Sequence, residues 1–183
     1  ILAQARRKKG TAAKLTHQVT RGLREGALLI LGALAIFLLV SLASYHPADP
    51  GWSSSGAVSR INNAGGLIGA WLADVLQYLL GYLAYLFPVM VGYSGWLVYQ
   101  GRSPTGGIDL HVLAIRWAGF LMTVGAGGGL ATLESGYSNG GLPAGAGGVL
   151  GDLVGNGLVG VVSPVGATLF LLAIFLTGVT LFT

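Results

Sequence analysis

The stretch from Gly65 to Gln100, GGLIGAWLADVLQYLLGYLAYLFPVMVGYSGWLVYQ, decides the fold of this chain. Asp74 is its only charged residue, and the run is too long for one ordinary membrane crossing, which takes about 20 to 25 residues of helix. We therefore divide it into a short glycine-rich helix over 65–74, at the membrane surface or dipping into it, and a spanning helix over 75–99. Pro88 is expected to kink the spanning helix.

The whole chain has the composition of an integral membrane protein. Of its 183 residues 53% are hydrophobic and only 9% are charged, whereas a soluble domain has about 25% charged residues. Glycine, with 32 residues, is frequent in membrane helices because it lets their backbones approach closely. Cysteine is absent from the sequence, which excludes disulfides, zinc–thiolate sites and thiol catalysis.

Positive charge is concentrated at the N-terminus, where seven of the 10 Lys and Arg residues lie within the first 24 positions. Residues 1–25 are expected to form a basic arm that stays in the cytoplasm, because Lys and Arg are enriched on that side of membrane proteins. Binding of lipid headgroups or of nucleic acid are alternatives, the latter weakened because no aromatic residues are interleaved with the charges. The residues assigned to orientation or lipid contact are Arg6, Arg7, Lys8, Lys9, Arg21, Arg24, Arg102 and Arg116.

Four apolar segments predict an all-α, multi-pass membrane domain over residues 26–183, with spans at 26–45, 75–99, 111–133 and 164–183. A cleaved signal peptide is the competing interpretation of the first span, and the long polar arm before it argues against cleavage. With the N-terminus inside, residues 100–110 form an inside loop, and segments 46–74 and 134–163 lie outside. The chain starts without methionine and stops within an apolar run, so we expect it to be part of a longer protein.

An internal repeat relates the two halves of this domain. GGVLGDLVGN, which starts at Gly147, matches GGLIGAWLAD, which starts at Gly65, so that Asn156 falls on Asp74. In each half a span leads to an outside loop, a short glycine-rich helix and a returning span in the same orientation. Chance similarity is common in apolar, glycine-rich sequence, so the repeat is a hypothesis for the structure to test.

Arg116 lies about a turn and a half into the third span, where a charge is by default a functional hypothesis. Near a helix end its side chain can reach back to the inner headgroups beside Trp117, which is our expectation. Pairing with a buried acid such as Asp74 is the alternative. The other charges are scattered, and no P-loop exists because no lysine follows Lys14, so we expect this segment not to be an enzyme and to hold no metal or cofactor.

Several stretches resemble the N-terminal membrane domain of the FtsK/SpoIIIE family of DNA translocases. They are LREGALLILGAL, SYHPADPGWS, INNAGGLIGAWLAD, GYLAYLFPVMV and the final GVTLFT. The resemblance implies four membrane helices, short glycine-rich helices on the periplasmic side, and both termini in the cytoplasm. It also implies an anchor in the bacterial inner membrane at the division septum, which contacts the bilayer and other division proteins.

In that family a linker and a hexameric ATPase motor follow the membrane domain, so the resemblance implies that ATP, magnesium and DNA are bound only by the motor. Two other functions are considered. One is a small transporter or channel subunit that uses Asp74 and Arg116 as a polar path. The other is a structural module whose six copies ring a DNA path.

The first outside loop and the helix after it are the predicted partner-binding site. The HPADPGWS and GGLIGAWLAD motifs supply both aromatic residues and tight glycine turns there. The alternative is that these residues only set the turn and the depth of the loop in the interface. The predicted partner-binding residues are Asp49, Pro50, Gly51, Trp52, Gly65, Gly66, Gly69, Trp71 and Asp74.

Overall fold

The computed structural model describes residues 2–53, 61–100, 110–135 and 141–183, with side chains from Gln18 onward. Every regular element in these residues is helical. They are α1 (Leu2–Ala43), α2 (Gly66–Leu80), the 3₁₀ helix η1 (Gly81–Tyr85), α3 (Leu86–Gln100), α4 (Leu110–Ser135), α5 (Gly148–Val159) and α6 (Pro164–Phe182). Four segments are long and apolar enough to cross a membrane: Gln18–Ala43, Gly66–Gln100, Leu110–Ser135 and Pro164–Phe182. The predicted all-α fold with four such helices is confirmed.

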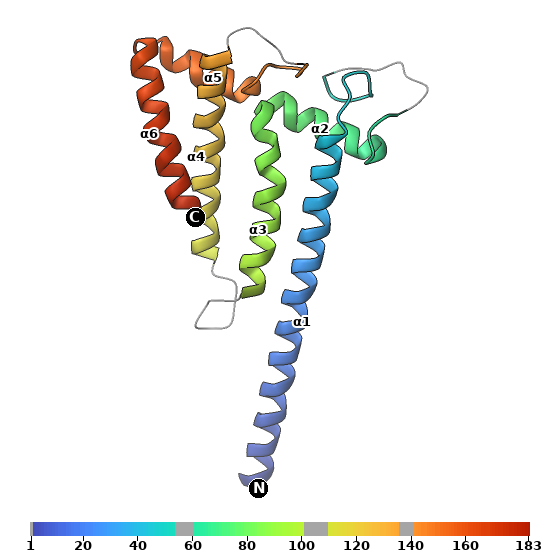
Figure 1. Ribbon diagram of the computed structural model, residues 1–183. Helices are drawn as coiled ribbons and strands as arrows, with labels where there is room; N and C mark the ends of the chain where they lie inside the picture. The colour runs from blue at the N-terminus through green and yellow to red at the C-terminus, as the bar shows by residue number, and fades with distance from the viewer. Residues whose placement is uncertain (1, 54–60, 101–109, 136–140) are drawn as a thin grey trace.

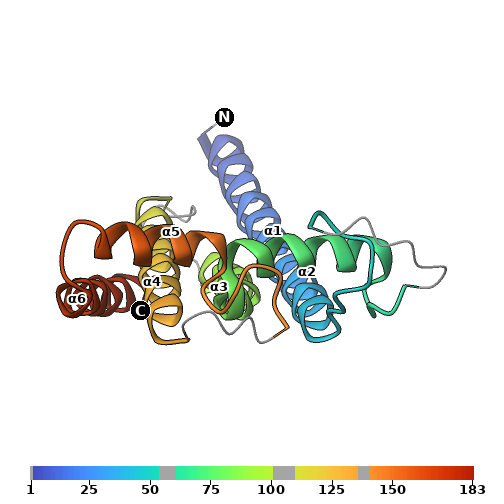
Figure 2. The ribbon, with the colours of Figure 1, turned by 90° about the horizontal axis from the view of Figure 1, so that it is seen from above.

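Helices α6, α4, α3 and α1 stand side by side in a single row, in that order (Figures 1 and 2). Helices α2 and α5 lie end to end across one end of the row, called here the upper end. The opposite, lower end holds the last residues of α3 and α6 and the first residues of α4. Helix α1 projects beyond this lower end (Figure 1).

Helix α1 contains both the predicted basic arm and most of the predicted first span. It runs unbroken for 42 residues, which corresponds to about 63 Å. The predicted boundary between an arm over 1–25 and a span over 26–45 therefore has no counterpart in the backbone. The sequence contains no proline before Pro47, so no residue in this region removes a helical hydrogen bond.

The chain turns six residues later than predicted. Helix α2 continues past Asp74 to Leu80, and the turn comes at Gly81, whose φ of +58° favours glycine. Pro88 falls in the first turn of α3, where proline is tolerated, so it lies near the start of a helix instead of kinking a long one. The division at residues 74 and 75 and the kink at Pro88 are thus corrected.

The internal repeat is present in the structure. Helices α2 and α5 both begin at a left-handed glycine, with φ of +65° at Gly66 and +64° at Gly148. The Gly66 amide donates to the carbonyl of Asn63 at 2.9 Å, and the Gly148 amide to that of Gly145 at 3.2 Å. Because α3 packs on α1 and α6 packs on α4, the chain forms two parallel halves, α1–α2–α3 and α4–α5–α6.

Two regions of contact between described residues join the α1–α2–α3 half to the α4–α5–α6 half. At the upper end the Tyr82 amide donates to the carbonyl of Ala146 at 2.9 Å, and a Cβ placed on Gly81 would lie 2.0 Å from the same oxygen. Lower down, a cluster of mainly aromatic side chains fills the space between α3, α4 and α6. This cluster contains Phe87, Met90, Tyr93, Trp117, Phe120, Val124 and Phe182.

Candidate functional site

The loop between α1 and α2 is closed by a buried carboxylate. Asp49 is only 5% exposed. Its two oxygens accept the backbone amides of Asn62 at 2.9 Å and Asn63 at 2.8 Å, and the Asn62 side-chain amide adds a third bond at 3.1 Å. Hydrogen bonds to a charged acceptor are stronger than neutral ones, so Asp49 fixes the end of the loop from which α2 begins.

A second buried carboxylate fixes the other part of the loop to α2. Asp74 is 3% exposed, and it accepts the Ser53 amide at 2.6 Å and the Ser53 hydroxyl at 2.7 Å. The Tyr45 hydroxyl donates to it at 3.3 Å. A Cβ on Gly51 would lie 2.6 Å from the Asp74 carboxyl carbon, so the loop backbone is pressed against this side chain.

Tyr45 supports this arrangement as a proton donor. It lies just beyond the end of α1, where burial and then the charge of Asp74 raise its pKa to about 12. The phenol therefore stays protonated at neutral pH, because deprotonation would place a second negative charge beside the carboxylate. The loop, the end of α1 and α2 are thus held by one set of hydrogen bonds.

Glycines allow α2 to pack closely against the end of α1. Asn63 donates from its side chain to the Ser41 carbonyl at 2.7 Å and accepts the Gly65 amide at 2.8 Å. A Cβ on Gly69 would lie 2.6 Å from the Asn63 side-chain oxygen and 2.7 Å from the Ser41 hydroxyl. The sequence analysis missed Ser41 and Asn63 as members of the site, although the Asn62–Asn63 pair is a typical turn signal.

The two tryptophans of the predicted site are open to the surroundings. Trp52 is 60% exposed and packs edge-on to Tyr78, with ring centroids 5.4 Å apart. Trp71 is 48% exposed and shares one face of α2 with Leu67 and Ile68 at helical spacing. We call the four exposed residues Trp52, Leu67, Ile68 and Trp71 the tryptophan face; its two tryptophans are the part of the predicted site that a partner can reach.

The structure brings the nine predicted residues together but gives them two roles. Asp49, Gly51, Gly65, Gly69 and Asp74 make contacts within the chain that fold the loop, as described above. Gly66 supplies the left-handed start of α2 and has open space around it, and Pro50 is half-buried. Only the tryptophans combine exposure with a large apolar surface, the property expected of an interaction site.

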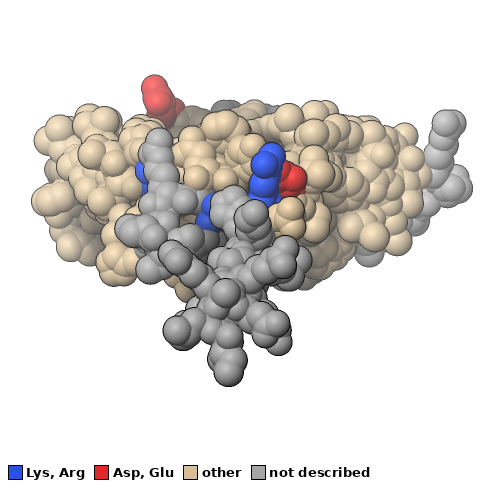
Figure 3. All heavy atoms as spheres, turned by 90° about the horizontal axis from the view of Figure 1, so that it is seen from below, with Lys and Arg blue, Asp and Glu red and all other residues tan. Residues whose placement is uncertain are grey.

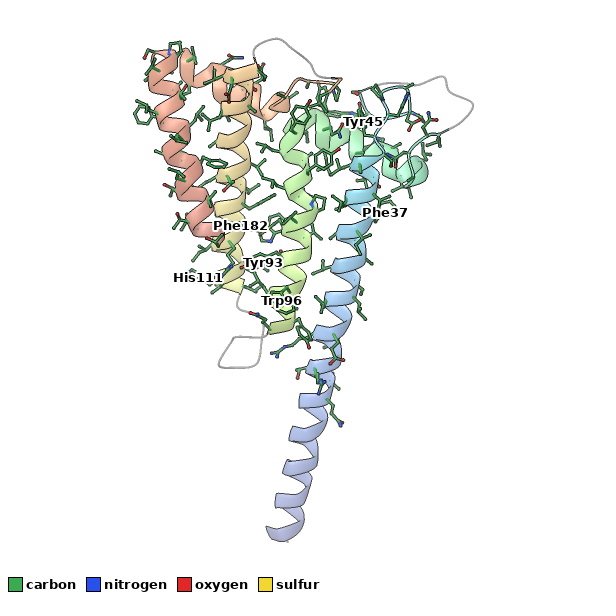
Figure 4. All side chains as sticks on the ribbon, in the orientation of Figure 1. Phe37, Tyr45, Tyr93, Trp96, His111 and Phe182 are labelled. Carbon is green, nitrogen blue, oxygen red and sulfur yellow. The ribbon has the colours of Figure 1, made fainter. Side chains whose placement is uncertain are left out.

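Arg116 lies in another part of the molecule, in the lower half between α3, α4 and α6. Its guanidinium donates to the Tyr93 hydroxyl and, at 3.3 Å, to the Phe182 carbonyl, and it lies 5.3 Å from the centre of the Tyr93 ring. Figure 4 shows Tyr93 and Phe182 far from Tyr45, which contacts Asp74 at the upper end. The alternative of an Arg116–Asp74 pair is therefore excluded.

Apart from Arg102, the remaining basic residues assigned to orientation lie on α1. Arg21 pairs with Glu25 at 2.8 Å on the helix surface, and Arg24 is half-buried. In the view from below, arginine side chains stand out from a largely uncharged surface (Figure 3). Arg102 lies outside the described residues, and the side chains of Arg6, Arg7, Lys8 and Lys9 are not among those described. Among the described residues no group of three His, Asp or Glu side chains could hold a metal ion.

Comparison with known proteins decides the family. Residues 20–183 match the 4TM region of DNA translocase FtsK/SpoIIIE. This chain belongs to the FtsK/SpoIIIE family. The resemblance seen in the motifs of the first half is thereby confirmed over nearly the whole sequence.

Relatives from three bacteria define how much of an FtsK protein this chain represents. DNA translocase FtsK of Pseudomonas aeruginosa is 38% identical over 173 residues, which are 93% of this chain and 21% of that protein. DNA translocase FtsK of Shewanella oneidensis is 38% identical over 88% of this chain and 17% of its own length. DNA translocase FtsK 2 of Ralstonia nicotianae is 36% identical over 93% of this chain and 22% of its own length.

The chain thus spans about a fifth of the length of these FtsK relatives. It corresponds to their membrane-spanning region, and the translocase motor is elsewhere in the full-length proteins. No solved structure matches the chain.

Proposed function

We propose that this domain anchors a DNA translocase in the bacterial inner membrane at the division septum. Membership of the FtsK/SpoIIIE family over residues 20–183 is the observation that carries this proposal. The four apolar helices supply the anchor, and the tryptophan face supplies a surface for other division proteins. ATP, magnesium and DNA would be bound by the motor of the full-length protein, which would assemble as a hexamer.

The charge distribution supports an orientation with both termini in the cytoplasm. The arginines with described side chains, Arg21, Arg24 and Arg116, lie in the lower part of the molecule or on α1. Of the described acids, Glu25 lies on α1 beside Arg21, whereas Asp49, Asp74, Glu134 and Asp152 lie at the upper end or near it. Lys and Arg favour the cytoplasmic side of a membrane protein. The upper end, with α2 and α5, would then face the periplasm.

A transport path through Asp74 and Arg116 receives no support from the geometry. The carboxylate is enclosed by Ser53 and Tyr45, and the guanidinium is held by Tyr93 and Phe182. The two groups lie at different levels of the row and share no partner, so they do not form a continuous polar route.

Cysteine labelling tests the orientation, because these 183 residues contain no cysteine and any cysteine elsewhere in the full-length protein can be replaced by serine. In the full-length protein we expect Ala48→Cys, in the exposed upper loop, to react with a membrane-impermeant maleimide in intact spheroplasts. Gln18→Cys, exposed on α1 beyond the lower end, is expected to react only after the membrane is opened. The reverse pattern would place the upper end in the cytoplasm and contradict the proposed topology.

Paired tryptophan variants test the contact with division proteins. Tryptophans are common among residues that cost 2 kcal/mol or more when truncated at an interface, which corresponds to about a thirty-fold loss of affinity. We expect full-length protein carrying Trp52→Ala and Trp71→Ala to stay in the membrane but to lose its accumulation at the septum. A crosslinking probe placed at residue 48 of this variant should also fail to crosslink to other division proteins.

Trp96→Ala is the matched control for these variants. Trp96 is as exposed as Trp71, at 48%, but it lies on α3 near the lower end (Figure 4). This control is expected to retain both localisation and crosslinks. Septal accumulation and crosslinks that survive in the double variant would show that the α1–α2 loop is only structural, while leaving the membrane anchor in place.

A further inference from the structure

Arg116 is the one described arginine whose charge meets only neutral groups within a packed part of the fold. The only ion pair among the described side chains joins Arg21 to Glu25 on the helix surface. Both partners of Arg116, the Tyr93 hydroxyl and the Phe182 carbonyl, are uncharged. No described residue therefore supplies a counter-ion to Arg116, and a positive charge at membrane depth is costly unless an anion or water compensates it.

One edge of the guanidinium is also free. Both hydrogen bonds of Arg116 use the same terminal nitrogen, Nη1, although a guanidinium carries five N–H donors. Neither Nε nor Nη2 of Arg116 donates a hydrogen bond to a described residue, and neither is among the buried polar atoms that lack a partner. Together these two nitrogens form the fork that binds two oxygens of one phosphate or carboxylate.

The edge of the guanidinium formed by Nε and Nη2 is fixed in position by the other contacts of Arg116. A snorkelling arginine normally has a mobile side chain, whereas Arg116 is fixed to α3 through Tyr93 and to the C-terminal end of α6 through Phe182. Its guanidinium also lies over the Tyr93 ring, 5.3 Å from the ring centre. Immobilising the fork in advance lowers the entropy that a ligand loses on binding.

The depth of Arg116 matches a lipid headgroup. The residue lies six positions after the first residue of α4, which is about 9 Å along the helix, and the side chain can extend toward the lower end. Trp117 and Tyr93, of the types enriched at membrane interfaces, flank it within the mainly aromatic cluster. A ligand that binds at this depth is therefore expected to be a group at the membrane surface, such as a lipid headgroup.

We propose that Arg116 binds the phosphate of an anionic phospholipid in the leaflet at the lower end of the row. Nε and Nη2 donate to two phosphate oxygens, and the charge of the guanidinium, which no described acid compensates, favours a lipid with net negative charge. Since α4 and α6 belong to one half and α3 to the other, the bound lipid stabilises the lower joint between the halves. This site does not depend on which leaflet is cytoplasmic.

Native mass spectrometry of the detergent-solubilised protein tests the site, with phosphatidylglycerol and phosphatidylcholine as the probes. We expect one phosphatidylglycerol to be retained by the unaltered protein, about tenfold more tightly than phosphatidylcholine. Arg116→Gln should abolish this preference, and Arg116→Lys, which keeps the charge but loses the fork, should reduce it. Arg21→Gln is the matched control and should retain the lipid, because Arg21 is exposed and already paired with Glu25.

A second measurement keeps the proposal testable if Arg116→Gln fails to fold. Photoactivatable phosphatidylglycerol incubated with unaltered protein is expected to crosslink to α3 and α4 around Tyr93 and Arg116. Crosslinks confined to other helices, or equal retention of both lipids by the unaltered protein, would overturn the lipid site. Displacement of the lipid by millimolar inorganic phosphate would show a site for free phosphate instead, and would overturn the assignment to a lipid.

Discussion

Gly148→Ala is expected to destabilise the chain more than Gly66→Ala, although the two glycines occupy equivalent positions of the repeat. Both have left-handed φ angles, of +64° and +65°, so alanine costs about 1–2 kcal/mol at either position. A Cβ on Gly66 meets open space, whereas one on Gly148 would lie 2.6 Å from the Gly81 amide nitrogen and the Leu79 carbonyl. Such overpacking adds about 1–3 kcal/mol, and it falls where the two halves meet.

Thermal unfolding of the two purified variants in the same detergent measures this difference. For a chain of this size 1 kcal/mol shifts the midpoint by about 2–4 °C, so we expect Gly148→Ala to unfold about 5 °C below Gly66→Ala. Gly81→Ala, with its Cβ 2.0 Å from the Ala146 carbonyl, should behave like Gly148→Ala. Equal midpoints for all three variants would show that the contact between α2 and α5 does not hold the halves together.

Asp74→Ala is expected to release the α1–α2 loop. The substitution removes the acceptor of the Ser53 amide, the Ser53 hydroxyl and the Tyr45 hydroxyl, and a hydrogen bond to a charged group contributes about 1.5–3 kcal/mol. Asp74→Asn keeps one acceptor oxygen and should lose less. Asp152→Ala is the matched control, because this acid is exposed on α5 and bonds only to Asn156, at 2.6 Å.

Limited proteolysis combined with the thermal midpoint distinguishes these variants. We expect Asp74→Ala to be cut within the α1–α2 loop much faster than the unaltered protein and to unfold several degrees lower. Asp152→Ala should change stability by less than about 0.5 kcal/mol, as is usual for a surface substitution. If Asp74→Ala resembles this control in both assays, the carboxylate does not fix the loop.

The number and approximate positions of the long helices could be predicted because hydropathy and length are local properties. The turn between α2 and α3 could not. The run was divided after Asp74, its only charged residue, because it is too long for one crossing. Ser53 and Tyr45, which are distant in sequence, instead bind this carboxylate in a buried position within the helix. The turn came instead at Gly81, whose conformation depends on the contact with Ala146 in the other half.

The site was predicted in its location but not in the roles of its residues. The motifs identified the correct loop and helix, yet no local signal separates an inward Asp49 from an outward Trp52. Ser41 was missed because a serine within an apolar helix gives no sign that a glycine will pack against its hydroxyl. For Arg116, the sequence left two outcomes open; the structure excludes the pair with Asp74, and no sequence signal indicated that Tyr93 and a helix end would hold the guanidinium.

The arrangement of the long helices in one row has a consequence for the bilayer itself. Only 17–33% of the most apolar window in each long segment is fully buried inside the chain, so most of those side chains are left for lipid or other chains to cover. Such a row forms a wall one helix thick. It encloses no lumen and separates the lipid on one side from the lipid on the other. Lipids on the two sides of one row can exchange only around its outer helices, α1 and α6. A closed ring around a patch of lipid would require several chains placed edge to edge.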